Sequence, residues 1–341
     1  INDSGTYLLR TPRQSELDHV DEVTPEVLMA RADAAKIRVL DHRLDCPREF
    51  PCYIGRNRYV SNLPGSTILV PVIDLTRQYI NGLLYLLSQD DGHRPTPIDD
   101  WNFYRKAGVG KWVKNGFLNP DLPLPLGYLG TFRMHVESDL LFQNLLLTIQ
   151  AMGLGGWVHA AFPDHILLGD PAFAKYGSGL GFRWAPAKRN LMRILRTPIT
   201  PLPAWRANPV GLDGKLEAYC PPYYPNMSAA VEAILREKYG PTGPYSDPAL
   251  FDKVFKPGLA QQFLDEVPHY SDDVIECVKD VCNYIYDTYG RFPAHADAIH
   301  VPGLWVQAHH LDLKYYDHLY QGGYSSTQAN HHDLWHGNAR D

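Results

Sequence analysis

Residues 137–152 carry the clearest helical pattern in the chain, and this pattern restricts the folds open to it. Apolar side chains recur there about once per helical turn of about 3.6 residues, at Leu140, Leu141, Leu145, Ile149 and Met152. Gly153 follows at the position where a helix commonly ends in a left-handed residue. We therefore expect a long central helix that buries one apolar face and ends at Gly153.

Strands and helices are both expected around this helix. The run 66–74 is dense in β-branched residues and short enough for a buried strand, and Pro71 within it predicts an edge position or a bulge. A second short strand is expected over 157–162. Helical spacing or capping residues predict helices over 24–39, 75–88, 227–239, 247–265, 271–289 and 302–320. The segment 89–130 is rich in Gly, Pro and Asp, which predicts a lid or surface excursion.

The distribution of these elements predicts an α+β fold in three parts. Residues 1–195 would form the core with an N-terminal arm. Residues 196–225 are punctuated by proline and would form a linker. Residues 226–341 would form a helical extension rich in His and Tyr.

Composition excludes several classes of protein. The chain has 341 residues, of which 45% are hydrophobic and 21% charged, as in an ordinary globular protein. Its net charge of −6 argues against a sequence-independent grip on nucleic acid. The longest apolar stretch is interrupted by Gln143, Asn144 and Gln150, which argues against a membrane span. Five cysteines without a Cys-x-x-Cys pair suit a reducing compartment, so we expect a cytoplasmic protein.

A family resemblance lies in the central helix and the glycine-rich segment after it. The stretch Gln143-Asn-Leu-Leu-Leu-Thr-Ile-Gln-Ala-Met-Gly-Leu-Gly-Gly-Trp157 resembles the nitroreductase pattern, in which an acidic residue, here Glu137, opens a helix that ends in Gly-Leu-Gly before a short strand. The resemblance covers roughly residues 60–185. It implies a nitroreductase-like mixed sheet flanked by helices, and a homodimer that forms through the central helix and holds FMN. The implied activity is oxidation or reduction of a small organic substrate, with NAD(P)H or another electron donor.

The resemblance also implies where FMN would bind. Backbone N–H groups after the helix would donate to the flavin ring, while the loop before the first strand would bring polar side chains to the ring and phosphate. The cofactor-binding candidates are Gly153, Leu154, Gly155, Gly156, Ala160, Ala161, Arg43, Arg48, Arg56, Asn57, Ser61 and Asn62. The candidate walls of the substrate pocket are Trp101, Tyr104, Trp112 and His159.

The uneven distribution of histidine supports a second hypothesis. Neutral imidazoles with carboxylates nearby can bind zinc or iron. The candidate ligands of a divalent metal are His295, Asp297, His300, His309 and His310, with Asp312 as a further carboxylate. Their spacing matches no known ligand motif, so packing at an interface or in a substrate pocket is the competing interpretation. His331, His332 and His336 lie in a polar tail and are expected to be solvated.

A third hypothesis is not enzymatic. The incomplete flavin motifs and the large extension are compatible with a cofactor-free scaffold derived from a nitroreductase, acting as a subunit of a larger complex.

Overall fold

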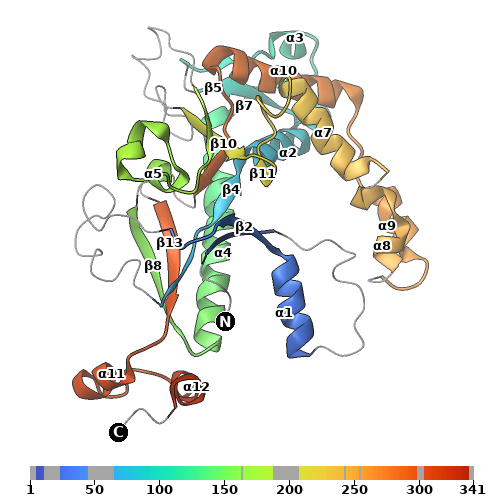
Figure 1. Ribbon diagram of the computed structural model, residues 1–341. Helices are drawn as coiled ribbons and strands as arrows, with labels where there is room; N and C mark the ends of the chain where they lie inside the picture. Colours follow the sequence, from blue (N-terminus) through green and yellow to red (C-terminus); the bar gives the residue numbers. More distant parts are fainter. Residues whose placement is uncertain are drawn as a thin grey trace.

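The computed structural model describes residues 5–10, 24–44, 65–100, 102–162, 164–186, 207–241, 243–252, 255–297 and 303–337. The fold is mixed α+β, as predicted (Figure 1). The strands are β1 (Thr6–Leu9), β2 (Lys36–Leu40), β3 (Thr67–Leu69), β4 (Val72–Asp74), β5 (Pro95–Asp99), β6 (Arg105–Lys106), β7 (Asn119–Pro125), β8 (Gly155–Phe162), β9 (Arg183–Ala185), β10 (Asn208–Leu212), β11 (Leu216–Glu217), β12 (His295–Asp297) and β13 (Gly303–His309). The helices are α1 (Pro25–Ala34), α2 (Leu75–Leu87), α3 (Gly110–Lys114), α4 (Leu126–Ala151), α5 (Asp164–Leu168), α7 (Met227–Tyr239), α8 (Pro248–Asp252), α9 (Leu259–Glu266), α10 (Asp272–Tyr289), α11 (Leu313–Leu319) and α12 (Ser326–His336), with single 3₁₀ turns η3 (Pro171–Tyr176) and η4 (Pro244–Ser246).

The central helix α4 covers one face of a three-stranded antiparallel sheet. The strand order is β3–β13–β8, so β13 pairs with both of its neighbours. Side chains of α4 and of the sheet interdigitate in an apolar layer made of Phe142, Leu145, Leu146, Ile149, Val158, Val306 and Ala308. This layer shares Leu145 and Ile149 with the face that the periodicity of 137–152 predicts, whereas Leu140, Leu141 and Met152 of that face are exposed. The helix also begins earlier, at Leu126.

A larger core lies between α2, α7, α10 and the first turn of α4. Its centre consists of side chains with no exposed surface, among them Leu83, Leu84, Leu87, Val278, Val281 and Ile285. Both ends of α10 are capped: Ser271 accepts a hydrogen bond from the N–H of Val274, and Gly290 adopts a φ of 67°. The predicted helices over 75–88, 227–239 and 271–289 are therefore confirmed almost to the residue.

Segment 89–130 is part of this core, and the prediction of a lid is wrong for its described residues. It forms β5, β6, α3 and β7, and Ala107, Val109 and Leu118 within it are buried. Trp112 donates a hydrogen bond from Nε1 to Asp280 Oδ2 of α10, at 2.7 Å. The strands in this segment are short and rich in proline, so they show no clear periodicity. Composition alone therefore predicts a surface excursion here.

The C-terminal part of the chain is less helical than predicted. Gly303–His309 is a strand, not the first half of a helix over 302–320. Trp305, Gln307 and His309 alternate with Val306 and Ala308, which is the two-residue period of a strand with both faces covered. The described parts before residue 195 and after residue 226 thus share one sheet and one core, since β13 pairs with β3 and α10 packs on α2.

One face of α4 carries large apolar side chains in solvent. Leu140, Leu141 and Leu147 are 62%, 43% and 53% exposed. A homodimer through the central helix, which the resemblance implies, would cover this face and stays a prediction. Among the helices that the structure describes, none is both long and apolar enough to cross a membrane.

Candidate functional site

The predicted flavin-binding turn at the end of α4 has no free amide in its first half. Gly153 has a φ of 76°, and its N–H donates to Gln150 O at 3.0 Å, while the N–H of Leu154 donates to Ile149 O at 3.1 Å. These two bonds are the Schellman motif that closes a helix. Gly155 and Gly156 then enter the antiparallel ladder opposite His309 and Ala308 of β13.

Protein atoms also fill the space beside the glycines. A β-carbon on Gly153 would lie 2.5 Å from the β-carbon of His331 and 2.6 Å from Thr327 O, both in α12. On Gly155 it would lie 2.6 Å from Leu311 Cδ2 and 2.8 Å from His309 Nε2. Close packing of the C-terminal part explains why glycine is required here. The turn does not fit an isoalloxazine ring stacked directly on these glycines.

The other flavin candidates give no second cradle. Arg43 donates to the carbonyl and hydroxyl oxygens of Ser66, so its guanidinium is already engaged by protein. Ala160 and Ala161 lie in β8, within the sheet. The remaining candidates, Arg48, Arg56, Asn57, Ser61 and Asn62, lie outside the described residues.

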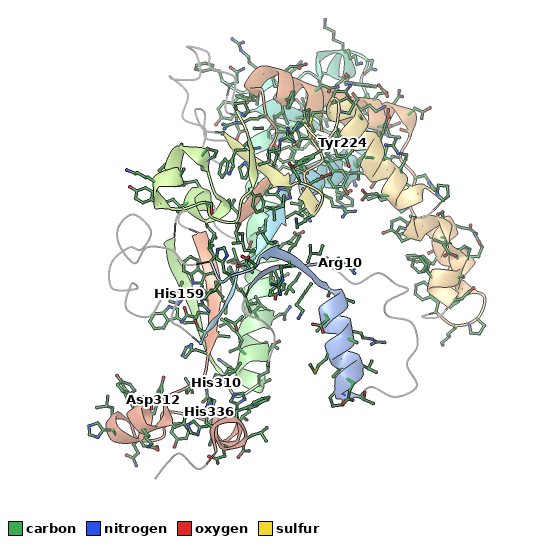
Figure 2. The ribbon with its side chains drawn as sticks, in the orientation of Figure 1. Arg10, His159, Tyr224, His310, Asp312 and His336 are labelled. Atoms are coloured by element: carbon green, nitrogen blue, oxygen red, sulfur yellow. The ribbon has the colours of Figure 1, made fainter. Side chains whose placement is uncertain are left out.

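The predicted pocket walls do not come together. Trp112 belongs to the core beside α10, whereas Tyr104 is 69% exposed with a φ of 54°. His159 is buried in β8 (Figure 2), and its ring stacks on Trp157 at a centroid distance of 5.4 Å. Burial lowers the pKa of His159 to about 4, with a smaller contribution from His309. Trp101 lies outside the described residues.

The predicted metal ligands are distributed over separate sheets. His295 is buried in β12, opposite Asp74 of β4, and Asp297 pairs with Val72 in the same ladder. Burial lowers the pKa of His295, an effect that Asp74 opposes. His309 and His310 instead lie at the far end of β13, and His300 lies outside the described residues. The predicted set therefore does not form one site.

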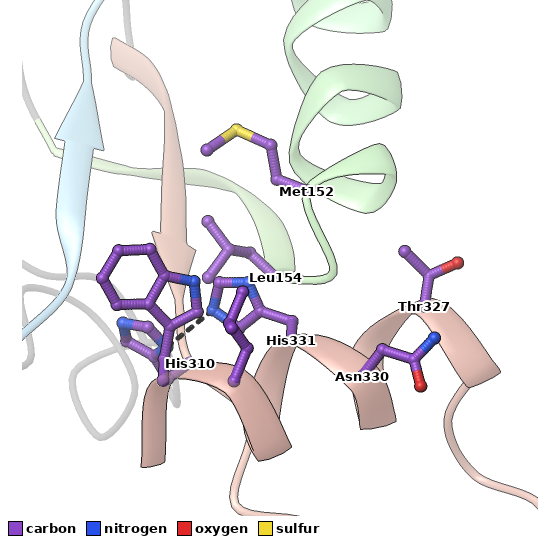
Figure 3. A pocket seen from close by; sticks show the side chains of 8 residues that line it. Met152, Leu154, His310, Thr327, Asn330 and His331 are labelled. Atoms are coloured by element: carbon purple, nitrogen blue, oxygen red, sulfur yellow. Dashed lines mark hydrogen bonds between the residues drawn. The ribbon is translucent and has the colours of Figure 1, made fainter. Parts of the chain in front are cut away.

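His310 meets a different pair of histidines, both from α12. Its Nδ1 lies 3.1 Å from His331 Nε2 and 2.9 Å from His336 Nε2. His332 stands one turn before His336, with a ring-centroid distance of 5.2 Å. The expectation that the tail histidines are solvated holds for His336, which is exposed, whereas His331 and His332 are half-buried. We call His310, His331 and His336 the imidazole cluster (Figures 2 and 3).

The helix α12, which carries His331 and His336, begins with a sequence signal of its own. Ser325 accepts from the N–H of Gln328 at 3.3 Å, and Gln328 Oε1 accepts from the N–H of Ser325 at 2.8 Å. This is a capping box, which Ser-x-x-Gln at the start of the segment predicts. Once α12 forms, His332 and His336 share a face and His331 lies beside them.

The imidazole cluster borders an open groove of about 500 Å³ between the end of α4 and α12 (Figure 3). This volume falls in the range of small-molecule sites. The groove is lined by Met152, Leu154, His310, Thr327, Asn330, His331, Leu334 and Trp335. Four of its walls are thus apolar or aromatic, and the others offer imidazole, amide and hydroxyl groups.

The contacts at His310 exceed what one ring nitrogen can satisfy. An imidazole nitrogen carries either one N–H or one lone pair, so it makes one well-directed hydrogen bond, yet two ring nitrogens face Nδ1. Burial lowers the pKa of His310, and the neighbouring His336 and His331 lower it further. The neutral form of His310 is therefore favoured, and neutral imidazole is the form that binds metal.

Comparison of the chain with protein-family models, with curated proteins and with solved structures finds no match. A proposal about function therefore rests on the geometry of the imidazole cluster and its groove.

Proposed function

We propose that the chain is a metal-dependent enzyme that holds a zinc-class ion in the imidazole cluster and acts on a small, largely apolar molecule in the adjoining groove. The observation that carries this proposal is the approach of two ring nitrogens, His331 Nε2 and His336 Nε2, to His310 Nδ1, at 3.1 and 2.9 Å. Metal-bound imidazole nitrogens at about 2.0–2.1 Å from a tetrahedral ion lie about 3.3 Å apart. In the described part of the chain, no three His, Cys, Asp or Glu side chains are already arranged to hold an ion. Closing the cluster around an ion therefore requires rotations of its rings.

Zinc is the metal class that the donor set favours. Imidazole suits zinc, whereas non-haem iron sites commonly include a carboxylate. Two carboxylates of the C-terminal part have other roles: Asp312 accepts the N–H of Tyr315 at 3.2 Å to cap α11, and Asp317 accepts the hydroxyl of Tyr324 at 2.6 Å. Three imidazole ligands leave one coordination position open, as in catalytic zinc sites. An ion so held supplies Lewis acidity and lowers the pKa of a water molecule, which suits hydrolysis or hydration.

The groove favours a substrate with an aromatic or aliphatic part. Met152, Leu154 and Leu334 supply apolar walls, and the indole of Trp335 supplies a flat surface for stacking. Asn330 offers an amide that can hydrogen-bond a polar group of the substrate. His310 and His331 line the same groove, so a molecule bound there lies beside the cluster.

Metal binding by the purified full chain tests this proposal. We expect stoichiometric uptake of Zn²⁺ in calorimetry, and a visible absorption band when Co²⁺ replaces it. His310→Ala should weaken Zn²⁺ binding by about 100-fold or more, because one ligand of three is lost. His318→Ala is the matched control, since His318 is an exposed tail histidine on α11 outside the cluster. Absence of binding, or equal affinity in His310→Ala, would overturn the proposal.

A nitroreductase-like flavoenzyme is the second candidate, and the exposed face of α4 favours it. Leu140, Leu141 and Leu147 would be covered in a dimer through the central helix. FMN would then have to bind away from the packed turn at Gly153. The absorption spectrum of the purified protein decides this, since a colourless, flavin-free preparation would end the flavin hypothesis.

A further inference from the structure

We propose that the ion in the imidazole cluster clips α12 to the body of the protein, so that metal binding assembles the substrate groove. This inference rests on the proposed metal site and adds a function for the tail. The ion would raise the population of the docked arrangement in which the groove is formed, and so favour substrate binding.

The first observation is that α12 buries little apolar surface. It contains no buried residue, and Leu334 and Trp335 are 77% and 65% exposed. Gln328 Nε2 reaches Leu154 O at 3.5 Å, the limit of a hydrogen bond. Such a helix gains little from apolar burial, so a cross-link to the body decides whether it stays docked.

The second observation is that the cluster spans the joint between tail and body. His310 directly follows β13, which is the central strand of its sheet, whereas His331 and His336 belong to α12. An ion shared by these three side chains would bind the docked arrangement and not the undocked one. At a free ion concentration of 100 times Kd, it would lower the undocked population by about 100-fold.

The third observation is that the groove has walls from both sides of this joint. Met152 and Leu154 come from the end of α4, and Thr327, Asn330, His331, Leu334 and Trp335 come from α12 (Figure 3). Undocking of α12 would remove most of the lining. Loss of the ion would therefore lower the population of chains in which the substrate groove is complete.

Hydrogen exchange of the full chain, with Zn²⁺ or with a chelator, tests the clip. We expect saturating Zn²⁺ to slow exchange of the amides in 329–336 by about 100-fold and to leave α10 unchanged, because α10 belongs to the large core. Zn²⁺ that binds without protecting 329–336 would overturn the clip and leave the proposed function standing. If no Zn²⁺ binds, calorimetry shows that the metal site itself has failed.

A matched pair of glycine variants tests the same coupling without replacing a ligand. Gly153→Ala places a β-carbon 2.5 Å from that of His331, which should prevent docking and weaken Zn²⁺ binding by at least about 10-fold. Gly116→Ala is the control, since Gly116 also follows a helix with positive φ, at 81°, but faces open space. Equal Zn²⁺ affinity in the two variants would overturn the inference.

Discussion

Gly153 and His331 approach so closely that a β-carbon on the glycine would lie 2.5 Å from the β-carbon of the histidine. Gly153 also has a φ of 76°, which side chains rarely adopt. Two separate requirements thus select glycine at one position. One comes from the end of α4, and the other from the helix that docks on it.

The stability of glycine variants separates these requirements. We expect Gly153→Ala to lower the free energy of unfolding by about 2–4 kcal/mol, since the φ costs about 1–2 kcal/mol and overpacking adds more. Gly116→Ala carries the same φ cost but places its β-carbon in open space. Its free energy of unfolding should therefore fall by only about 1–2 kcal/mol. Urea denaturation measures both values. An equal decrease in the free energy of unfolding of the two variants would show that contact with α12 adds no cost at Gly153.

Trp335 should contribute to binding in the groove but not to metal binding. Trp335→Ala removes an indole from the lining, so we expect affinity for an anilinonaphthalene sulfonate dye to fall about 10-fold, corresponding to about 1.4 kcal/mol. The Kd for Zn²⁺ should rise much less than in His310→Ala, because no ligand is lost. Tyr85→Ala, which removes an aromatic ring 59% exposed outside the groove, is the control and should leave dye binding unchanged. Fluorescence titration reports the dye.

Trp112 should behave as a core residue and not as a pocket wall. Trp112→Phe removes the bond to Asp280 Oδ2, 2.7 Å long, and should lower the free energy of unfolding by about 1 kcal/mol. Binding of Zn²⁺ and of the dye should stay unchanged. Lys111→Ala removes an ion pair with the same carboxylate, 2.8 Å long, and should cost less because the lysine is 64% exposed. A large loss of dye binding in Trp112→Phe would restore its predicted place in a pocket.

His159 should make the protein less stable in acid. Its pKa is about 4 in the folded chain and 6.5 ordinarily, so the unfolded chain binds the proton more readily. The neutral ring therefore contributes full stability above pH 6.5, and this contribution falls as pH drops from 6.5 towards about 4. His159→Phe keeps an aromatic ring beside Trp157 without titrating. Its free energy of unfolding should decline less steeply over this interval than that of the wild type, as measured by chemical denaturation at several pH values.

Elements with strong local signals could be predicted from the sequence. The helices α2, α7 and α10 combine an apolar face with a capping residue, and Gly153 ends α4 as expected. Pro71 marks a break between β3 and β4, in line with the expected irregularity. In each case the information lies within one or two turns of chain.

The errors concern elements whose neighbours are distant in sequence. β13 is flanked by β3 and β8, both distant in sequence, and its run of seven residues is too short for the apolar positions to distinguish a strand from the start of a helix. The imidazole cluster joins His310 to residues more than twenty positions away, so spacing along the chain could not reveal it. The capping box at Ser325 was the available local signal, because it predicts the helix on which the other two histidines lie.

The central place of β13 has a consequence for how the chain matures. Until residues 303–309 leave the ribosome, β3 and β8 lack the partner that joins them, and both expose unpaired backbone edges. A nascent chain, or a product truncated before Gly303, would hold an incomplete sheet and would be prone to aggregate. The three-stranded sheet is therefore complete only after residues 303–309 have been synthesised and have paired with β3 and β8.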